Sequence, residues 1–221
     1  MIWTILILIA IFCFSIAWPT LFSENKLDKR IVYWLYDNFG FIFFSSDTTQ
    51  QWQKLLKILN LKGNETILEI GTATGGLSLT IASQPGFYGH VTGIDWSPQM
   101  IEKAQKSALK LKIEQLTSFN VTDVSEFVPF DNESFDIVLC VGVLELLKKP
   151  EDLFTEIDRV LKPEGVLVVS LYQEWYSGKT INLSWFKEKL MSIGLSELQI
   201  IPCRISHDLI IAWHPSFSTK N

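Results

Sequence analysis

From about residue 48 onward, short apolar strand patterns alternate with helical patterns, and this alternation limits the possible folds more than any other feature of the chain. The strand patterns cover residues 66–70, 91–94, 116–119, 135–140, 165–170, 197–203 and 209–213. Helical patterns occur at residues 52–59, 75–83, 98–111, 151–161 and 183–193. Strands that are apolar throughout and alternate with helices form a parallel sheet covered on both faces. We therefore expect an α/β fold with a doubly wound, mostly parallel sheet of seven strands.

The last two strand patterns are joined only by a short turn near residues 204–207. A parallel crossover needs a dozen residues or more, so we expect the last strand to be antiparallel. The full length of 221 residues suits one α/β domain with a short appendage. We place the domain at residues 48–217.

The appendage is the leader, residues 1–22, which contains no charged side chain. A helix that is apolar on every side has no face for water, and this length matches the ~30 Å hydrocarbon core of a bilayer. Trp3 and Trp18 lie near its ends, where an aromatic belt would place them. We expect a transmembrane helix that anchors the chain. A cleaved signal peptide and a buried core helix are the competing interpretations, although no basic start or small-residue cleavage site is evident.

Basic residues follow the leader, at Lys26, Lys29 and Arg30, and none precedes it. The positive-inside rule therefore predicts a single-pass membrane protein whose C-terminal domain is cytoplasmic. Residues 23–47 form a connector that is rich in aromatic side chains. This connector is either a helix and loop covering the core, or a lid that faces the membrane interface or the substrate.

Charge and cysteine content exclude several classes of site. The net charge of −5, without a dense Lys/Arg cluster, argues against a nucleic-acid surface. Cys13, Cys140 and Cys203 lie far apart and have no metal-ligand spacing, so we expect no metal site. We expect Cys140 and Cys203 to be small buried hydrophobic residues.

A glycine-rich turn follows the first strand pattern, where residues 68–76 read LEIGTATGG. Gly71 and Gly75 let the backbone bend sharply and let a ligand approach without a Cβ in the way. Asp95 ends the next strand pattern ~24 positions after Gly71, where a carboxylate can accept both hydroxyls of a ribose. In open α/β sheets, ligands bind beyond the carboxyl ends of the strands. The pattern predicts a nucleotide-like cofactor, and a dinucleotide is loosely compatible with the spacing of Gly71, Ala73 and Gly76.

Four segments resemble, in order, motifs of the class I S-adenosylmethionine (SAM)-dependent methyltransferases. They are residues 67–75 (first motif), 130–136 (before the fourth strand), 143–147 (after that strand) and 159–165 (before the fifth strand). The resemblance spans about residues 48–214, and it implies a Rossmann-like fold, SAM as cofactor and methyl transfer as the activity. The region with Tyr36 and Trp52 is also similar to the segment before the first motif in quinone-biosynthesis methyltransferases.

The resemblance implies a role for each matching position. Glu69 and Asp95 stand at the family's two acidic positions, and Asp95 should bind the ribose. The residues expected along the methionine part of SAM are Gly71, Thr72, Ala73 and Gly75. Trp96 should lie against the adenine face, and either Asn120 with Val121 or Asp123 with Val124 should cap the adenine edge. Val141 and Gly142 should pass close to the sulfonium.

The chain departs from the family at two positions. Ala73 replaces the usual middle glycine, and we expect a tolerable loss of room there. Leu146 stands where many relatives carry histidine, so the easiest general base is missing. The remaining polar candidates for catalysis are Glu145, Tyr172 and Tyr36. We expect His90, His207 and His214 to be strand-end or surface histidines.

Methyl transfer from a sulfonium requires alignment and exclusion of water, and a base only if the nucleophile must lose a proton first. Without an obvious base, we expect an acidic or already nucleophilic acceptor, such as a thiol, an enolisable ring carbon or an amine. The leader and the connector favour a small, hydrophobic or lipid-like acceptor. The alternatives are a non-catalytic SAM-binding scaffold at a membrane and, more distantly, an oxidoreductase with a nucleotide cofactor.

Overall fold

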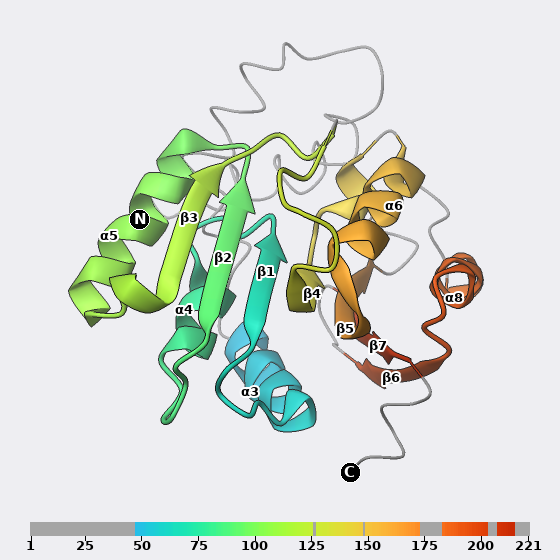
Figure 1. Ribbon diagram of the computed structural model, residues 1–221, viewed down its shortest axis with the longest axis horizontal. Helices are drawn as coiled ribbons and strands as arrows, with labels where there is room; N and C mark the ends of the chain where they lie inside the picture. The colour runs from blue at the N-terminus through green and yellow to red at the C-terminus, as the bar shows by residue number, and fades with distance from the viewer. Residues whose placement is uncertain (1–46, 126, 148, 173–182, 203–206, 215–221) are drawn as a thin grey trace, which may run out of the picture.

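The computed structural model describes residues 47–125, 127–147, 149–172, 183–202 and 207–214, and they contain one seven-stranded sheet in the order β3-β2-β1-β4-β5-β7-β6 (Figure 1). The strands are β1 (Thr66–Ile70), β2 (His90–Asp95), β3 (Thr117–Val121), β4 (Phe135–Cys140), β5 (Leu161–Tyr172), β6 (Glu197–Ile201) and β7 (His207–Trp213). All neighbouring pairs are parallel except those of β7, which is antiparallel to both β5 and β6. The expected mostly parallel sheet with a reversed last strand is confirmed.

The helices are α3 (Asp47–Leu59), α4 (Gly76–Ala82), α5 (Pro98–Leu111), α6 (Pro150–Val160) and α8 (Leu183–Ser192), with short 3-10 helices η2 (Glu114–Leu116) and η3 (Leu144–Leu146). One core packs α6 and α8 against one face of the sheet, and a second packs α3 and α4 against the other. Strand β1 contributes to both, because Leu68 points into the first core and Ile67 into the second. This explains why the strand patterns are apolar throughout.

The winding of the sheet reverses between β1 and β4. The chain moves outward from β1 to β2 and β3, then returns to place β4 on the other side of β1. Figure 1 shows the arrowheads of β1, β2 and β3 at the same, upper edge. In such sheets the crevice beyond the carboxyl ends at the reversal is the usual ligand site.

Helix α5 shows why the sequence folds as it does beside this edge. Ser97 caps it, because the Ser97 Oγ accepts a hydrogen bond of 3.2 Å from the Met100 N–H. Pro98 occupies the first turn, where no N–H is needed. The helix ends at Lys112, whose backbone is left-handed with φ 59°.

Five strands differ from their expected bounds, β2, β3, β5, β6 and β7, and β5 differs most. Strand β5 begins at Leu161 rather than at residue 165, and Leu161 pairs with Phe135 before the register shifts at Ile137. Pro163 and Gly165 interrupt the apolar pattern there, so the sequence indicated a later start. Strand β3 covers Thr117–Val121, because the residues just before it form η2.

The expected leader helix at residues 1–22 and most of the connector at residues 23–47 lie outside the described residues. Within the part of the chain that the structure describes, no helix is both long enough and apolar enough to cross a bilayer. Cys140 is fully buried on β4, as expected, whereas Cys13 and Cys203 lie outside the described residues.

Candidate cofactor site

The turn between β1 and α4 has a backbone conformation that most side chains disfavour. Gly71, Ala73 and Gly75 have φ angles of 76°, 49° and 79°, all left-handed. A Cβ on Gly71 would lie 2.2 Å from the Val143 Cγ2. Glycine is therefore required at position 71 both by its backbone angle and by the close approach of the segment after β4.

Ala73 occupies the left-handed region without being glycine, which costs about 1–2 kcal/mol. Its side chain is buried, and its N–H donates a 2.9 Å hydrogen bond to the Asp95 Oδ2. The expected loss of room at this position is accompanied by backbone strain, which this buried, charge-assisted hydrogen bond offsets.

Glu69 holds the turn from beneath. Its Oε2 accepts hydrogen bonds from the Thr72 Oγ1 at 2.6 Å, from the Ser78 N–H at 3.1 Å and from the Ser78 hydroxyl. Burial raises the pKa of the Glu69 carboxyl above its ordinary value, although these hydrogen bonds oppose the shift. Glu69 therefore joins β1, the turn and the first turn of α4 into one polar cluster.

Asp95 holds the same turn from the side. It is 3% exposed, and its Oδ1 accepts a 2.9 Å hydrogen bond from the Ser97 N–H, while its Oδ2 takes the one from Ala73. The Asp95 backbone carbonyl accepts from the Thr122 N–H at 2.8 Å, just beyond β3. One residue thus connects the carboxyl ends of β1, β2 and β3.

Three further glycines, Gly93, Gly142 and Gly76, lie near this edge. A Cβ on Gly93 would lie 2.7 Å from both Thr72 Oγ1 and Phe119 Cδ1. Gly142, with φ 74°, donates its N–H to the Ser170 Oγ at 2.8 Å. A Cβ on Gly76 would come within 2.7 Å of Trp52, so α3 also contacts the turn.

The structure brings most of the sequence-predicted site residues to one edge of the sheet. These are Glu69, Gly71, Thr72, Ala73, Gly75, Asp95, Trp96, Val141 and Gly142. Asn120 lies within β3, paired with Ile94, whereas Asp123 lies beyond the end of β3. The Asp123 Oδ1 accepts a 3.0 Å hydrogen bond from the Ser125 N–H. Val121 is the last residue of β3 and is exposed.

The three catalytic candidates are described to different extents. The backbone of Glu145 lies in η3, directly after β4 and its glycine. Tyr172 ends β5 and is the cross-strand partner of His207. Tyr36 lies outside the described residues. In the described ranges, no three His, Cys, Asp or Glu side chains gather closely enough to hold a metal ion.

Sequence reasoning missed two residues at this edge. His207 is at a strand end, as expected, but it is buried, and burial lowers its pKa to about 4. The sequence signal for this burial was the position of His207 at the start of β7, just before a run of apolar residues. Ser170 contacts Gly142 across 28 positions of sequence, and no local pattern indicates such a contact.

A bare, left-handed turn after β1, with a buried carboxylate at the end of β2, defines this domain as a nucleoside-cofactor-binding α/β domain. Comparison with known proteins agrees with this class of domain. Residues 61–198 match the methyltransferase domain family. The YqeM protein of Bacillus subtilis is 30% identical over 161 residues, which are 70% of this chain and 62% of YqeM.

Two further similarities are informative. The ubiquinone/menaquinone biosynthesis C-methyltransferase UbiE of Geobacter sp. is 31% identical over 122 residues, 54% of this chain and 51% of UbiE. A SAM-dependent methyltransferase from Aquifex aeolicus has the same fold, with a TM-score of 0.61, 20% identity, and coverage of 73% of this chain and 88% of that one. The chain spans less than two thirds of the length of the two curated relatives. It belongs to the methyltransferase domain family.

Proposed function

We propose that this protein transfers a methyl group from SAM to a small, hydrophobic acceptor associated with a membrane. The observation that carries the proposal is the left-handed turn at residues 71–75, held by Glu69 below and by Asp95 at its side. A turn with so few side chains allows a nucleoside to approach the backbone closely, with its sugar beside the carboxylate at the end of the next strand. The residues present therefore fit SAM.

When bound, SAM supplies an electrophilic methyl group on a positively charged sulfur. Asp95 would bind the ribose hydroxyls, because its buried carboxylate ends β2 beside the turn, and carboxylate oxygens accept hydrogen bonds. Asp123 rather than Asn120 caps the adenine, because Asp123 follows the carboxyl end of β3 whereas Asn120 lies within the strand. Val141 and Gly142, directly after β4, would lie near the methyl group of bound SAM and would limit access of water to it.

The acceptor is a quinone precursor or a similarly apolar molecule. The quinone assignment rests on the name of the UbiE relative, which shares about half of its length with this chain. The uncharged leader at residues 1–22 supports a membrane location, since it would concentrate the enzyme where such molecules dissolve. If the leader spans the membrane, Lys26, Lys29 and Arg30 after it favour a cytoplasmic catalytic domain by the positive-inside rule.

The acceptor is acidic or already nucleophilic, because Leu146 occupies the position of the usual histidine. Leu146 ends η3 and is half-buried. We therefore expect that Leu146→His leaves the rate of methyl transfer unchanged or lowers it. A large increase in the initial rate would contradict this assignment.

Binding is the first test. Titration calorimetry of the purified full chain should detect binding of S-adenosylhomocysteine (SAH) and no binding of NAD. Asp95→Ala should weaken SAH binding at least about tenfold, since it removes a charge-assisted contact. Asp152→Ala is the matched control, because Asp152 is an exposed carboxylate in the first turn of α6. Equal affinity of the wild type and Asp95→Ala for SAH would refute the site.

Transfer is the second test. The full chain is incubated with methyl-labelled SAM and either demethylated quinone precursors in detergent or a membrane extract, followed by mass spectrometry. Label in a lipid-soluble product supports the proposal. SAH binding without labelled product in either mixture would instead favour the non-catalytic scaffold.

A further inference from the structure

A single ion pair on α6 holds the segment that follows β3. Arg159 and Glu156 lie one turn apart on α6, and the Arg159 Nη2 is 2.7 Å from the Glu156 Oε2. The Arg159 Nε also donates to the Glu156 Oε1 at 3.1 Å, so the contact is bidentate. Both side chains are partly buried, with 25% and 19% of their surface exposed. Such a pair has a fixed geometry and is screened less than a surface pair.

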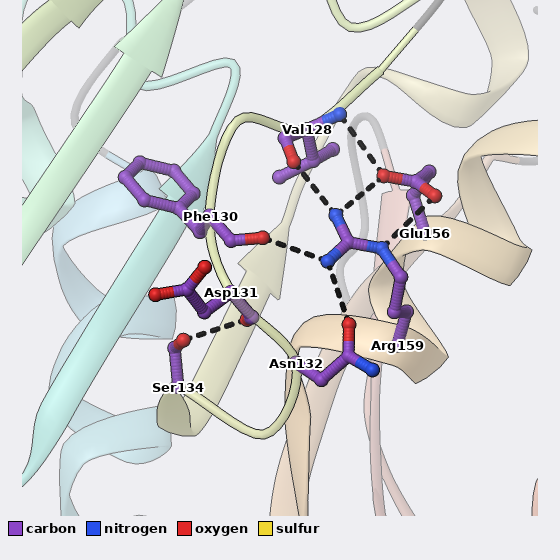
Figure 2. Close-up of polar contacts among 7 residues, drawn as sticks. All are labelled: Val128, Phe130, Asp131, Asn132, Ser134, Glu156 and Arg159. Atoms are coloured by element: carbon purple, nitrogen blue, oxygen red, sulfur yellow. Dashed lines mark hydrogen bonds and ion pairs between the residues drawn. The ribbon is translucent and has the colours of Figure 1, made fainter.

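The same two side chains bind the backbone of the segment at residues 127–132, as Figure 2 shows. The Arg159 Nη2 donates to the Val128 carbonyl at 2.8 Å and its Nη1 to the Phe130 carbonyl at 2.7 Å. The Glu156 Oε2 accepts from the Val128 N–H at 3.1 Å. Arg159 also contacts the Asn132 Oδ1 at 3.1 Å.

Packing reinforces these hydrogen bonds. The guanidinium lies over the ring of Phe127, 5.0 Å from its centroid, while Val128 is fully buried. The Phe130 ring makes an edge contact with Phe135 on β4, with centroids 5.1 Å apart. The guanidinium thus binds two carbonyls that lie outside the helices and strands; the Val128 carbonyl also accepts from the Phe130 N–H at 2.8 Å. The planar fork of arginine suits several acceptors at once, whereas lysine presents a single point charge.

This segment and the candidate adenine-capping residue belong to one connection between β3 and β4. At its start, the Thr122 N–H is bound to the Asp95 carbonyl at 2.8 Å. At residues 127–132 it is bound to α6 by Arg159 and Glu156. Asp123 lies between these two attachments, followed by Val124, which packs on the core. Loss of the second attachment would leave the part of the connection after Asp123 supported by the packing of Val124 and Val128 without the hydrogen bonds to α6.

We propose that Arg159 and Glu156 are positioning residues for SAM, acting through the backbone of residues 127–132 on Asp123 at the adenine edge. This inference rests on the proposed function. Helix α6 therefore affects the affinity for the cofactor and does not affect the methyl-transfer step. Preorganisation of a binding segment increases affinity by removing the cost of ordering it on binding.

A second ion pair in the same protein provides the matched control. The Lys162 Nζ lies 2.8 Å from the Asp136 Oδ1, and the Asp136 Oδ2 accepts the Thr66 N–H at 2.8 Å. This pair also attaches backbone to side chains and is also partly buried, with 37% of each side chain exposed. Asp136 is the second residue of β4, and Thr66 is the first residue of β1. The pair therefore lies at the amino edge of the sheet, opposite the cofactor site.

The test compares SAH affinity by calorimetry for the wild-type full chain, Arg159→Lys and Asp136→Asn, with urea unfolding of each. Arg159→Lys keeps the charge but loses the bidentate contact and the paired carbonyl contacts. We expect about tenfold weaker SAH binding for Arg159→Lys. We expect less than a twofold change for Asp136→Asn, even where both variants lose stability. Where the labelled-transfer assay gives a rate, the KM for SAM should rise in Arg159→Lys while kcat stays within about twofold.

Three outcomes are decisive. SAH affinity of a folded Arg159→Lys within twofold of wild type would overturn the inference, as would equal weakening in Asp136→Asn. If Arg159→Lys does not fold, Glu156→Gln is used in its place, because Gln can still accept the Val128 N–H while the ion pair is lost. Unchanged SAH affinity of Glu156→Gln would also overturn the inference. Failure of the proposed function looks different, since the wild-type chain itself would then not bind SAH.

Discussion

Acidification should destabilise this protein through His207. Burial lowers the pKa of His207 from its ordinary value of 6.5 to about 4, and the neighbouring Asp208 opposes this only in part. The unfolded chain therefore binds a proton between these two pH values that the folded chain does not bind. The stabilisation is fully present above about pH 6.5 and is lost as the pH falls towards 4.

The magnitude follows from the pKa difference. A shift of one pKa unit corresponds to about 1.4 kcal/mol, so about 3 kcal/mol is lost once His207 is protonated in both the unfolded and the folded chain, below about pH 4. Linkage applied to the two pKa values gives a loss of about 2 kcal/mol between neutral pH and pH 5. For a domain of this size, that loss is a large part of the total free energy of unfolding.

The assay is urea unfolding followed by circular dichroism, between pH 7.5 and 4.5, for the wild type, His207→Asn and the matched control His214→Asn. His214 lies just past the other end of β7 and is half-buried. The wild type and His214→Asn should lose about 2 kcal/mol more than His207→Asn on going from pH 7 to pH 5. Parallel pH profiles for wild type and His207→Asn would refute the reasoning, whatever the absolute stability of the variant.

Other substitutions should have separable effects. Because burial raises the pKa of Glu69, the wild type should lose stability as the pH rises above about 4.5, and Glu69→Gln should abolish this component of the urea-midpoint profile. Gly71→Ala should lower the free energy of unfolding by roughly 2–4 kcal/mol in urea, since the new Cβ adds a penalty for the left-handed backbone and a clash with Val143. Gly86→Ala should lower it by only about 1–2 kcal/mol, because a Cβ there meets nothing within 4 Å. Ser97→Ala should cost about 1 kcal/mol through loss of the α5 cap; equal stability of this variant and the wild type would show that the cap contributes nothing.

Much of the cofactor site could be predicted from short segments. The turn at residues 71–75 and the carboxylate of Asp95 each lie at the end of an apolar strand pattern, and the edge of a parallel sheet brings such ends together. The left-handed backbone at Ala73 could not be predicted, because alanine rarely adopts it. It depends on the Asp95 carboxylate, which is 22 positions away.

Contacts between distant segments account for what the sequence did not reveal. Arg159 reaches carbonyls 29 and 31 positions earlier in the chain, and Gln51 on α3 donates to the His207 carbonyl across 156 positions. Neither contact leaves a periodic pattern, since a single arginine or glutamine reads as an ordinary surface residue. The burial of His207 has the same origin.

The sequence by itself determined which segments are strands and helices, because periodicity and turn residues act within a few positions of one another. It also determined that the last strand is reversed, since the turn before it is too short for a crossover. Only the tertiary structure decided that β7 inserts between β5 and β6 and that the chain returns from β3 to place β4 beside β1. Strand order depends on which apolar faces bury one another, and that is a property of packing between remote segments rather than of any local pattern.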